Sequence, residues 1–404
     1  MIVVVGAGAA GLAAAIFARA GGRAVTVVET TDDGGRKILI SGGGRCNVLP
    51  EALEPRRFVT ESPASLVQRL LRSWPLKAQL AFFEHEVGVP LAFDAGSRKW
   101  FPRSNRARDV RDGLVALARR RGVLFRFGTE CRDVRPAPVG WRVETSGGGI
   151  DAHAVIVATG GLSVPATGST GLGLTLAERL GHAVHPTYPA LTPLVSEPFR
   201  HRTLAGVSLA VRLRAAWSRG ELETHGGFLF THRGYSGPSI LDISHVAVRS
   251  DALGEPRAVI RVRWCDRGEA EWRRELLVSG GLTITAVARH LPQRLAEQLV
   301  VECGIPADRR AAELRREERQ RLVEALVSYE LPWTGNEGYR KAEVTGGGVA
   351  LDDVDPQSLE SRRHPGLFLC GELLDAFGPI GGHNFAWAWA TGRLAGRGAA
   401  ARLA

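Results

Sequence analysis

The segment from Ile2 to Glu29 constrains the fold more than any other part of the chain. An apolar run, Ile2 to Val5, suits a buried parallel strand, and the next six residues, GAGAAG, match G-x-G-x-x-G. An Ala-rich helical pattern continues to about Ala20, and the β-branched run 24–29 ends in an acid. Because strand, turn, helix, strand and acid follow one another as in a dinucleotide-binding unit, we predict an α/β, Rossmann-like domain.

Each part of the glycine turn has a physical role. Gly6 permits a tight turn, Gly8 lets the backbone approach a pyrophosphate, and Gly11 lets the helix pack closely on the strand. The helix start supplies N–H donors and positive dipole, and Glu29 is expected to accept hydrogen bonds from the adenosine ribose. The predicted contacts are Gly6, Gly8, Ala9, Ala10, Gly11 and Glu29.

The stretch GRKILISGGGRCN, residues 35–47, follows the second strand and carries three consecutive glycines between cations. It is no Walker loop, because G-x-x-x-x-G-K-[ST] is absent. A reactive-thiol role for Cys46 is not favoured, because no general base is identifiable and the cysteines lack the paired spacing of disulfide-relay flavoproteins. We expect the glycines to allow close backbone approach to a cofactor and the cations to offset pyrophosphate charge. The predicted contacts are Arg36, Lys37, Ser41, Gly42, Gly43, Arg45, Cys46 and Asn47.

Two later segments indicate FAD rather than NAD as the dinucleotide. An apolar strand, 154–158, ends in Thr-Gly-Gly, and another, 367–370, runs into Gly-Glu and a second glycine turn that opens a helix. These resemble the flavin-binding motifs of the glutathione-reductase-like superfamily, in which a helix N-terminus at the flavin stabilises its anionic reduced form. The segment 122–134 resembles the strand-turn that contacts adenine. The implied contacts are Cys131, Thr159, Gly160, Gly161, Gly371, Glu372, Gly382, His383 and Asn384.

Several longer blocks resemble one family over nearly the whole chain. They are GRKILISGGGRCN, TGSTGLG, FPRSNRARDV, FLFTHRGYSGPSIL and AEVTGGGVALDDVDP. They are similar to the BaiN-like or aminoacetone-oxidase-like flavoproteins, although relatives typically carry Tyr at His383 and a Thr-Met start where SLES stands at 358–361. The resemblance implies a glutathione-reductase-like FAD domain split into 1–190 and 335–404, with a β-rich insert at 191–275 and a small helical insert at 276–334.

Residue patterns in the insert agree with that division. Val207, Leu209, Val211 and Leu213 alternate with smaller or charged residues, which predicts antiparallel strands with one buried face. From about 283 to 330 leucines recur at helical spacing. The net charge is +10, but the densest charged segment, 307–326, mixes both signs at helical spacing. Mixed signs describe a solvated helix, so nucleic acid is not expected as a partner.

Other classes of site and location are not supported. The apolar N-terminus has no basic region before it and is interrupted by glycines, so we expect neither a signal peptide nor a membrane anchor, and a cytoplasmic location. The five cysteines form no C-x-x-C pair and the histidines no zinc spacing, so no metal site is expected. A small-molecule substrate is the expected partner.

The reaction stays open between three hypotheses. In the first, NAD(P)H transiently reduces the flavin, which then saturates a substrate C=C or similar bond. In the second, a small amine reduces the flavin and oxygen reoxidises it, as in an aminoacetone oxidase. In the third, the chain is a non-enzymatic flavin-binding sensor or partner-binding module. No second G-x-G-x-x-G follows a strand, so no dedicated NAD(P)H domain is evident. The side-chain candidates for catalysis are His383, Tyr235 and His232.

Overall fold

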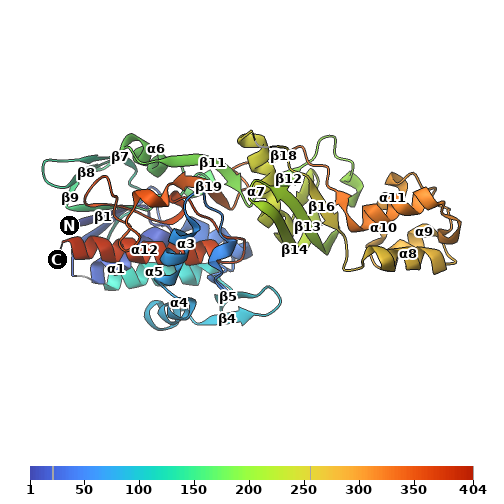
Figure 1. The fold of residues 1–404 in the computed structure, drawn as a ribbon. Helices are drawn as coiled ribbons and strands as arrows, with labels where there is room; N and C mark the ends of the chain where they lie inside the picture. The colour runs from blue at the N-terminus through green and yellow to red at the C-terminus, as the bar shows by residue number, and fades with distance from the viewer. Residues whose placement is uncertain (21, 255, 404) are drawn as a thin grey trace. The chain divides into compact units, whose positions relative to one another are not determined.

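The computed structural model describes residues 1–20, 22–254 and 256–403. The chain forms two compact units, which Figure 1 colours by position in the sequence. The first unit combines Met1–Thr187 with Glu343–Ala404, and the second is Tyr188–Ala342. The chain passes from the first unit to the second within β11 (Val184–Ala190).

The first unit is built on a five-stranded parallel sheet with the order β20-β10-β1-β2-β6. Its strands are β1 (Ile2–Val5), β2 (Val25–Val28), β6 (Leu124–Arg126), β10 (Ala154–Val157) and β20 (Leu367–Leu369). Val5 pairs with both Val28 and Val157, and Val157 pairs with Leu369, so the carboxyl ends of four strands are level. The predicted α/β class and Rossmann-like sheet are confirmed.

Two helices of small residues pack together beside this sheet. They are α1 (Ala9–Ala20) and α12 (His383–Arg402), which run side by side in Figure 1. A side-chain carbon on Gly396 would lie 2.9 Å from the backbone nitrogen of Ala18, and one on Gly392 would lie 3.0 Å from the β-carbon of Ala13. The helices therefore approach too closely for larger residues at these two positions.

Smaller elements complete the first unit. One antiparallel sheet has the order β3-β5-β4 and another β7-β8-β9. The further strands are β3 (Leu49–Pro50), β4 (Leu91–Asp94), β5 (Lys99–Pro102), β7 (Cys131–Pro136), β8 (Trp141–Thr145), β9 (Gly148–Ala152) and β19 (Val344–Val349). The further helices are α2 (Arg36–Ile40), α3 (Ala64–Arg72), α4 (Leu76–Ala81), α5 (Ala107–Arg120) and α6 (Leu172–Arg179).

The second unit contains a seven-stranded antiparallel sheet with the order β17-β16-β13-β14-β15-β12-β18. In β13 the side chains of Val211, Leu213 and Ala215 are buried and alternate with exposed arginines, as the sequence predicted. The strands are β12 (Leu194–Val195), β13 (Ser208–Trp217), β14 (Gly220–Phe230), β15 (Gly234–Ser236), β16 (Ile260–Arg263), β17 (Tyr329–Glu330) and β18 (Gly335–Asn336).

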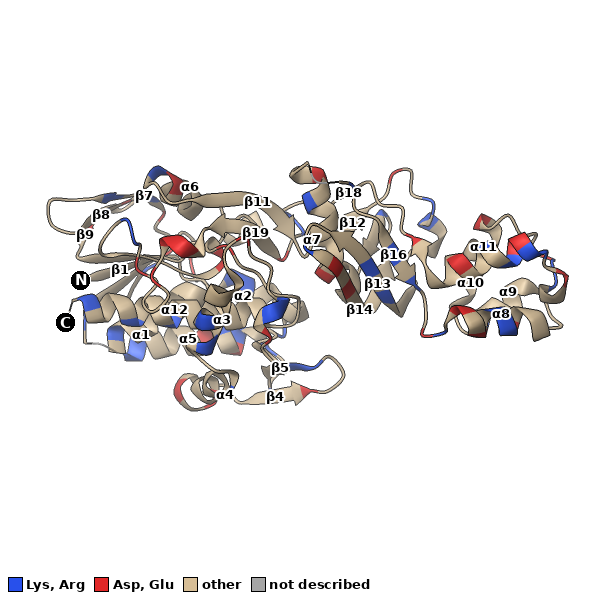
Figure 2. Cartoon of the chain, viewed as in Figure 1, with Lys and Arg blue, Asp and Glu red and all other residues tan. Residues whose placement is uncertain are grey.

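The helices of this unit differ in part from the prediction. α7 (Pro238–Ala252) packs on β13 and β14 within the segment expected to hold only strands. The helices that follow α7 in the sequence of this unit are α8 (Glu269–Val278), α9 (Thr283–Ala288), α10 (Gln293–Glu302) and α11 (Arg316–Val327). The charged segment 307–326 becomes an α-helix only at Arg316, and Figure 2 shows both signs of charge on α11. The division of the insert near residue 275 stays a prediction.

Two other kinds of feature are absent from the described part of the chain. Within it, no helix has the length and apolarity needed to cross a membrane. Across residues 1–20, 22–254 and 256–403, no group of three or more His, Cys, Asp or Glu side chains is placed to hold a metal ion.

Candidate active site

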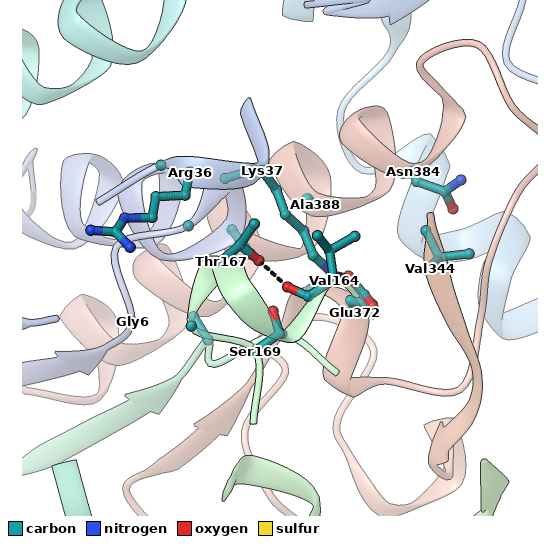
Figure 3. Close-up of a pocket in the computed structure, with 18 of the residues that line it drawn as sticks. Gly6, Arg36, Lys37, Val164, Thr167, Ser169, Val344, Glu372, Asn384 and Ala388 are labelled. Atoms are coloured by element: carbon teal, nitrogen blue, oxygen red, sulfur yellow. Dashed lines mark hydrogen bonds and ion pairs between the residues drawn. The ribbon is translucent and has the colours of Figure 1, made fainter. Parts of the chain in front are cut away.

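A cavity of about 640 Å³ lies at the carboxyl ends of β1, β2 and β10 in the first unit. Ligands of open α/β sheets bind at this edge. Figure 3 shows part of its lining, with Gly6 near one end and Val344 and Asn384 near the other. The predicted residues that line it are Gly6, Gly8, Ala9, Ala10, Glu29, Arg36, Lys37, Ser41, Gly42, Gly43, Asn47, Cys131, Thr159, Gly160, Gly371, Glu372, Gly382 and Asn384.

The glycine turn after β1 has the geometry that its sequence predicted. Gly6 has a φ of 102°, and a β-carbon there would lie 2.6 Å from the carbonyl oxygen of Ala158. A β-carbon on Gly8 would meet no atom within 4 Å, because Gly8 faces the cavity. Gly11 lies outside the lining, and a β-carbon there would overlap the carbonyl oxygen of Gly6. Gly8 therefore keeps space open for a ligand, whereas Gly11 serves packing.

Glu29 follows β2 and lines the cavity, but both of its carboxylate oxygens already accept hydrogen bonds from the protein. The backbone N–H of Ala7 donates to one oxygen at 2.7 Å. The backbone N–H and the hydroxyl of Thr31 donate to the other at 2.8 and 2.7 Å. The carboxylate is thus held in place by the turn it faces, and its contact with a ribose stays a prediction.

The loop after α2 presents backbone rather than thiol to the cavity. Gly42 and Gly43 have φ of 56° and 67°, a left-handed conformation that favours glycine. Cys46 is fully buried outside the lining, and burial raises the pKa of its thiol to about 12. Cys131 does line the cavity, and burial raises the pKa of its thiol to about 11. Neither cysteine is a nucleophile near neutral pH, since the thiolate is the reactive form.

The cations of the same loop do not all line the cavity. The guanidinium of Arg45 lies over the ring of Phe101, 4.2 Å from its centre, and 3.9 Å from Asp94. Arg45 is therefore not brought to the lining, contrary to its predicted role. Arg36 lines the cavity and is half-exposed, with Asp33 3.5 Å away. Of the cations predicted to offset pyrophosphate charge, Arg36 remains the best placed.

Lys37 belongs to a polar network that sequence reasoning missed. Its ammonium contacts the Glu372 carboxylate at 2.6 Å and the Ser163 hydroxyl at 2.5 Å, and Figure 3 shows its side chain extending toward Glu372. The second Glu372 oxygen accepts from the Ser163 hydroxyl at 2.5 Å and from the Thr345 N–H and hydroxyl at 3.0 Å. The network links α2, the end of β20 and β19 across the cavity. Because Glu372 neutralises Lys37, the predicted role of Lys37 toward pyrophosphate is weakened.

The turn before α12 is locked by a side chain. Asn384 accepts a hydrogen bond from the Gly378 N–H at 2.8 Å and donates one to the Gly378 carbonyl at 2.9 Å. Gly382 precedes the helix in a left-handed conformation, with a φ of 98°. The N-terminus of a 20-residue helix therefore borders the cavity and supplies N–H groups and positive dipole there.

The predicted catalytic side chains lie away from the lining. His383 is buried, contacts the Ile380 carbonyl at 3.3 Å, and burial lowers its pKa to about 4, so the ring is neutral near pH 7. Tyr235 belongs to the second unit, where its hydroxyl lies 3.0 Å from a ring nitrogen of His201. His232 is exposed in the same unit. Gly161 also lies off the lining, and a β-carbon there would lie 2.7 Å from that of Thr345.

Four charged lining residues were not singled out by the sequence pattern, namely Lys99, Glu130, Arg132 and Glu343. Lys99 opens β5, and a β-carbon on Gly381 would lie 2.9 Å from its Cε, so the Lys99 side chain runs along the turn before α12. Glu343 directly precedes β19 and its side chain is exposed to the cavity. The surrounding protein partly desolvates the carboxyl group and raises the pKa of Glu343. The one sequence signal for Glu343 is its place in the AEVTGGGVALDDVDP block, whereas Lys99 lies two residues before the FPRSNRARDV block.

Comparisons with known proteins agree with this geometry. Residues 1–398 match the family described as HI0933-like protein Rossmann domain. The chain is 32% identical over 403 residues to the ribosomal RNA dihydrouridine synthase of Escherichia coli strain K12, covering 96% of this chain and 95% of that protein. It is 32% identical over 413 residues to the 3-dehydro-bile acid delta(4,6)-reductase of Clostridium scindens, covering 99% of both.

Solved structures show the same fold at low identity. The 3-ketosteroid-delta4-(5alpha)-dehydrogenase of Rhodococcus jostii RHA1 matches with a TM-score of 0.53 and 15% identity, over 99% of this chain and 96% of that one. The 3-ketosteroid delta1-dehydrogenase of Sterolibacterium denitrificans matches with a TM-score of 0.52 and 14% identity, over 99% of both. From the family match over almost the whole chain and the dinucleotide turn that borders the cavity, we conclude that the protein belongs to the HI0933-like family of FAD-dependent oxidoreductases.

Proposed function

We propose that the protein is a flavin-dependent reductase that adds two hydrogens across a carbon–carbon double bond conjugated to a carbonyl group, with NAD(P)H as the source of electrons. One observation carries the proposal. A single cavity runs from the dinucleotide turn at Gly6 to the start of α12, where Lys99 and Glu343 face it. Such a cavity has room for both a cofactor and a substrate.

The names of the relatives support this class of reaction. One makes dihydrouridine in ribosomal RNA and another is a delta(4,6)-reductase of a 3-dehydro bile acid. Both names describe saturation of a C=C bond. In uridine and in a 3-keto-4-ene that bond is conjugated to a carbonyl group, which makes it an acceptor for hydride. The two substrates differ in size and charge, so the shared chemistry is the part we carry over to this protein.

The residues of the cavity fit FAD. The open face of Gly8 admits a pyrophosphate beside the first turn of α1, with Arg36 as counter-charge. Glu29 and Cys131 border the adenosine end, and the turn 380–382 borders the flavin end. When bound, FAD supplies hydride chemistry. The positive end of α12 would favour the negative charge that the reduced flavin carries.

Apolar side chains complete the flavin end. Phe377, Ile380 and Trp387 line the cavity there, and Asn384 fixes the turn that carries two of them through its hydrogen bonds to Gly378. Apolar walls exclude water from a hydride acceptor, while the turn before α12 keeps backbone donors in place. These residues bind and orient, and they leave the proton needed at the substrate to another group.

The first experiment separates this reductase from an amine oxidase and from a non-enzymatic flavin protein. The purified protein, saturated with FAD, is mixed anaerobically with NADH or NADPH while the flavin absorbance is followed. We expect NADH or NADPH to bleach the flavin absorbance at least as fast as the enzyme turns over. Absence of bleaching, together with oxygen uptake on addition of aminoacetone or another small amine, would establish the oxidase instead. No response to either reductant would identify a sensor or partner-binding module.

The second experiment compares substrate classes on the reduced protein. Unmodified ribosomal RNA, uridine and a 3-keto-4-ene steroid are each added anaerobically, and recovery of the oxidised flavin spectrum is followed. We expect one class to restore the spectrum and to gain the mass of two hydrogens. RNA as the responsive substrate would overturn the expectation, drawn from mixed charge, that nucleic acid is not a partner. If no C=C substrate reoxidises the flavin faster than buffer, the proposal fails.

A further inference from the structure

Glu343 is a carboxylic acid that lines the cavity and directly precedes Val344, which Figure 3 places near Asn384 at one end. All six residues of β19, which follow it, are buried, whereas the Glu343 side chain is exposed to the cavity. Its backbone carbonyl accepts a hydrogen bond from the Ser163 hydroxyl at 3.3 Å, which ties Glu343 to the Lys37–Glu372 network. Among residues 1–20, 22–254 and 256–403, none forms a hydrogen bond or ion pair with its carboxylate. The backbone is therefore fixed while the acid group is free to meet a ligand.

Of the charged groups that share the cavity with Glu343, some neutralise each other and one cation does not. Lys37 on α2 and Glu372 after β20 neutralise each other at 2.6 Å, so neither imposes a net charge on the cavity. Lys99 on β5 lines the same cavity and makes no ion pair within the described part of the chain. Its positive charge acts on Glu343 in the direction of ionisation, whereas desolvation acts more strongly in the opposite direction and raises the pKa of Glu343. The carboxyl group thus keeps its proton to a higher pH than a surface glutamate does.

Other groups that could deliver a proton are less suited. His383 is neutral, buried and outside the lining, and Cys131 lies with Glu29 at the adenosine end. Asn384 has both side-chain atoms engaged by Gly378.

We propose that Glu343 is the general acid of the reductase, and that its carboxyl O–H delivers the proton to the substrate carbon next to the carbonyl group. The inference rests on the proposed function. The substrate receives hydride from the reduced cofactor at the far carbon of the C=C bond. The electron pair that this leaves, delocalised onto the carbonyl, forms the new C–H bond with the Glu343 proton. The O–H bond breaks, a carboxylate remains beside the ammonium of Lys99, and water reprotonates it. The sum is addition of hydride and a proton, with NAD(P)H oxidised.

The test uses full-length protein loaded with FAD and three variants. Glu343→Gln removes the acid, Glu343→Asp shortens it, and Glu84→Gln is a matched control because Glu84 is exposed and does not belong to the cavity lining. We expect all variants to keep the flavin spectrum and the rate of bleaching by the nicotinamide. Reoxidation by the C=C substrate should fall about 100- to 10,000-fold in Glu343→Gln, recover in part in Glu343→Asp, and stay unchanged in Glu84→Gln.

Two readouts identify the proton itself. In the wild type, substrate-driven reoxidation should decline as the pH rises through the pKa of Glu343, because the protonated form is lost, and Glu343→Gln should show no such decline. In the FAD-loaded protein without substrate, infrared difference titration should show a protonated carboxyl band that persists to a higher pH than that of a surface glutamate and is missing from Glu343→Gln. This second readout does not depend on turnover.

The outcomes separate the inference from the function on which it rests. If the wild type reduces a C=C substrate and Glu343→Gln matches it in rate and pH profile, the inference fails and the proposed function stands. Loss of this band in the wild type at the pH at which a surface glutamate ionises also overturns the inference. If no C=C substrate reoxidises the wild-type flavin, both fail together.

Discussion

Gly8 and Gly11 belong to the same turn, yet the structure predicts opposite consequences for replacing each by alanine. A β-carbon on Gly8 would meet no protein atom within 4 Å, and Gly8 has no left-handed φ. Alanine there should leave the apoprotein as stable as the wild type, or more stable by about 0.4–1 kcal/mol, because it restricts the unfolded chain. The new methyl group would instead enter the space assigned to the cofactor pyrophosphate. Overpacking of about 1–3 kcal/mol corresponds to FAD binding about 5- to 150-fold more weakly.

Gly11→Ala is the matched comparison. Its β-carbon would overlap the carbonyl oxygen of Gly6, and would lie 2.9 Å from that carbonyl carbon and 3.4 Å from the Ala158 β-carbon. The overlapped atoms belong to the backbone of the turn after β1 and cannot rotate away as a side chain can, so we expect a loss of about 3 kcal/mol or more of folding stability. That loss corresponds to a fall of about 6–12 °C in the midpoint of thermal unfolding.

The assay measures both quantities on the same preparations. Apoprotein stability is obtained from urea unfolding, and FAD affinity from quenching of flavin fluorescence on titration. Wild-type FAD affinity in Gly8→Ala would refute the assignment of the cavity face at Gly8 to the pyrophosphate. Wild-type stability in Gly11→Ala would refute the packing argument. Equal loss of stability in both variants would show that the two glycines do not have separate roles.

Four further predictions concern the site and the packing of the helices beside it. Cys46→Ala should retain FAD and most turnover, because the thiol is buried and protonated, with a pKa raised to about 12; lost turnover with bound flavin would restore a reactive thiol. Since burial lowers the pKa of His383 to about 4 from an unfolded value of about 6.5, stability should fall as the pH drops through this window, by about 1.4 kcal/mol per pH unit for this residue, and urea unfolding of His383→Phe should show a shallower slope. In a double-mutant cycle on urea unfolding, Lys37→Met and Glu372→Gln should couple by about 1–3 kcal/mol; additive losses would contradict the 2.6 Å contact. Gly396→Ala should lower stability by about 1–3 kcal/mol without touching the cavity, and an unchanged urea midpoint would contradict the close approach of α1 and α12.

The parts of the site that the sequence predicted are those whose reasons are local. A turn that needs a left-handed residue and an open face requires glycine, so the G-x-G-x-x-G spacing after an apolar strand is enough to place Gly6 and Gly8. The prediction that Cys46 is not a reactive thiol was equally local, because no base and no second cysteine lies near it in the sequence.

The parts that escaped prediction depend on tertiary structure. Glu343 precedes a strand in which every residue is buried, and nothing in AEVTGGGV says that its side chain faces a cavity. The pairing of Lys37 with Glu372 joins positions 335 residues apart. α7 was missed for a different reason. Its sequence is rich in Ile, Val and Ser, which occur as readily in strands, and it is buried around most of its circumference, so it shows no helical stripe.

The close contact of α1 and α12 also has a consequence for the order in which the protein matures. Along the chain α1 precedes the second unit, whereas α12 follows the whole of it, so α1 is synthesised first. Synthesis of the roughly 200 residues after Thr187 takes about 10–40 s at about 5–20 residues per second. During that interval the alanine face of α1 has no partner from α12, and the flavin end of the cavity does not exist. FAD is therefore expected to bind late in synthesis. Binding of FAD would indicate that the second unit and α12, which borders the cavity, have both been made.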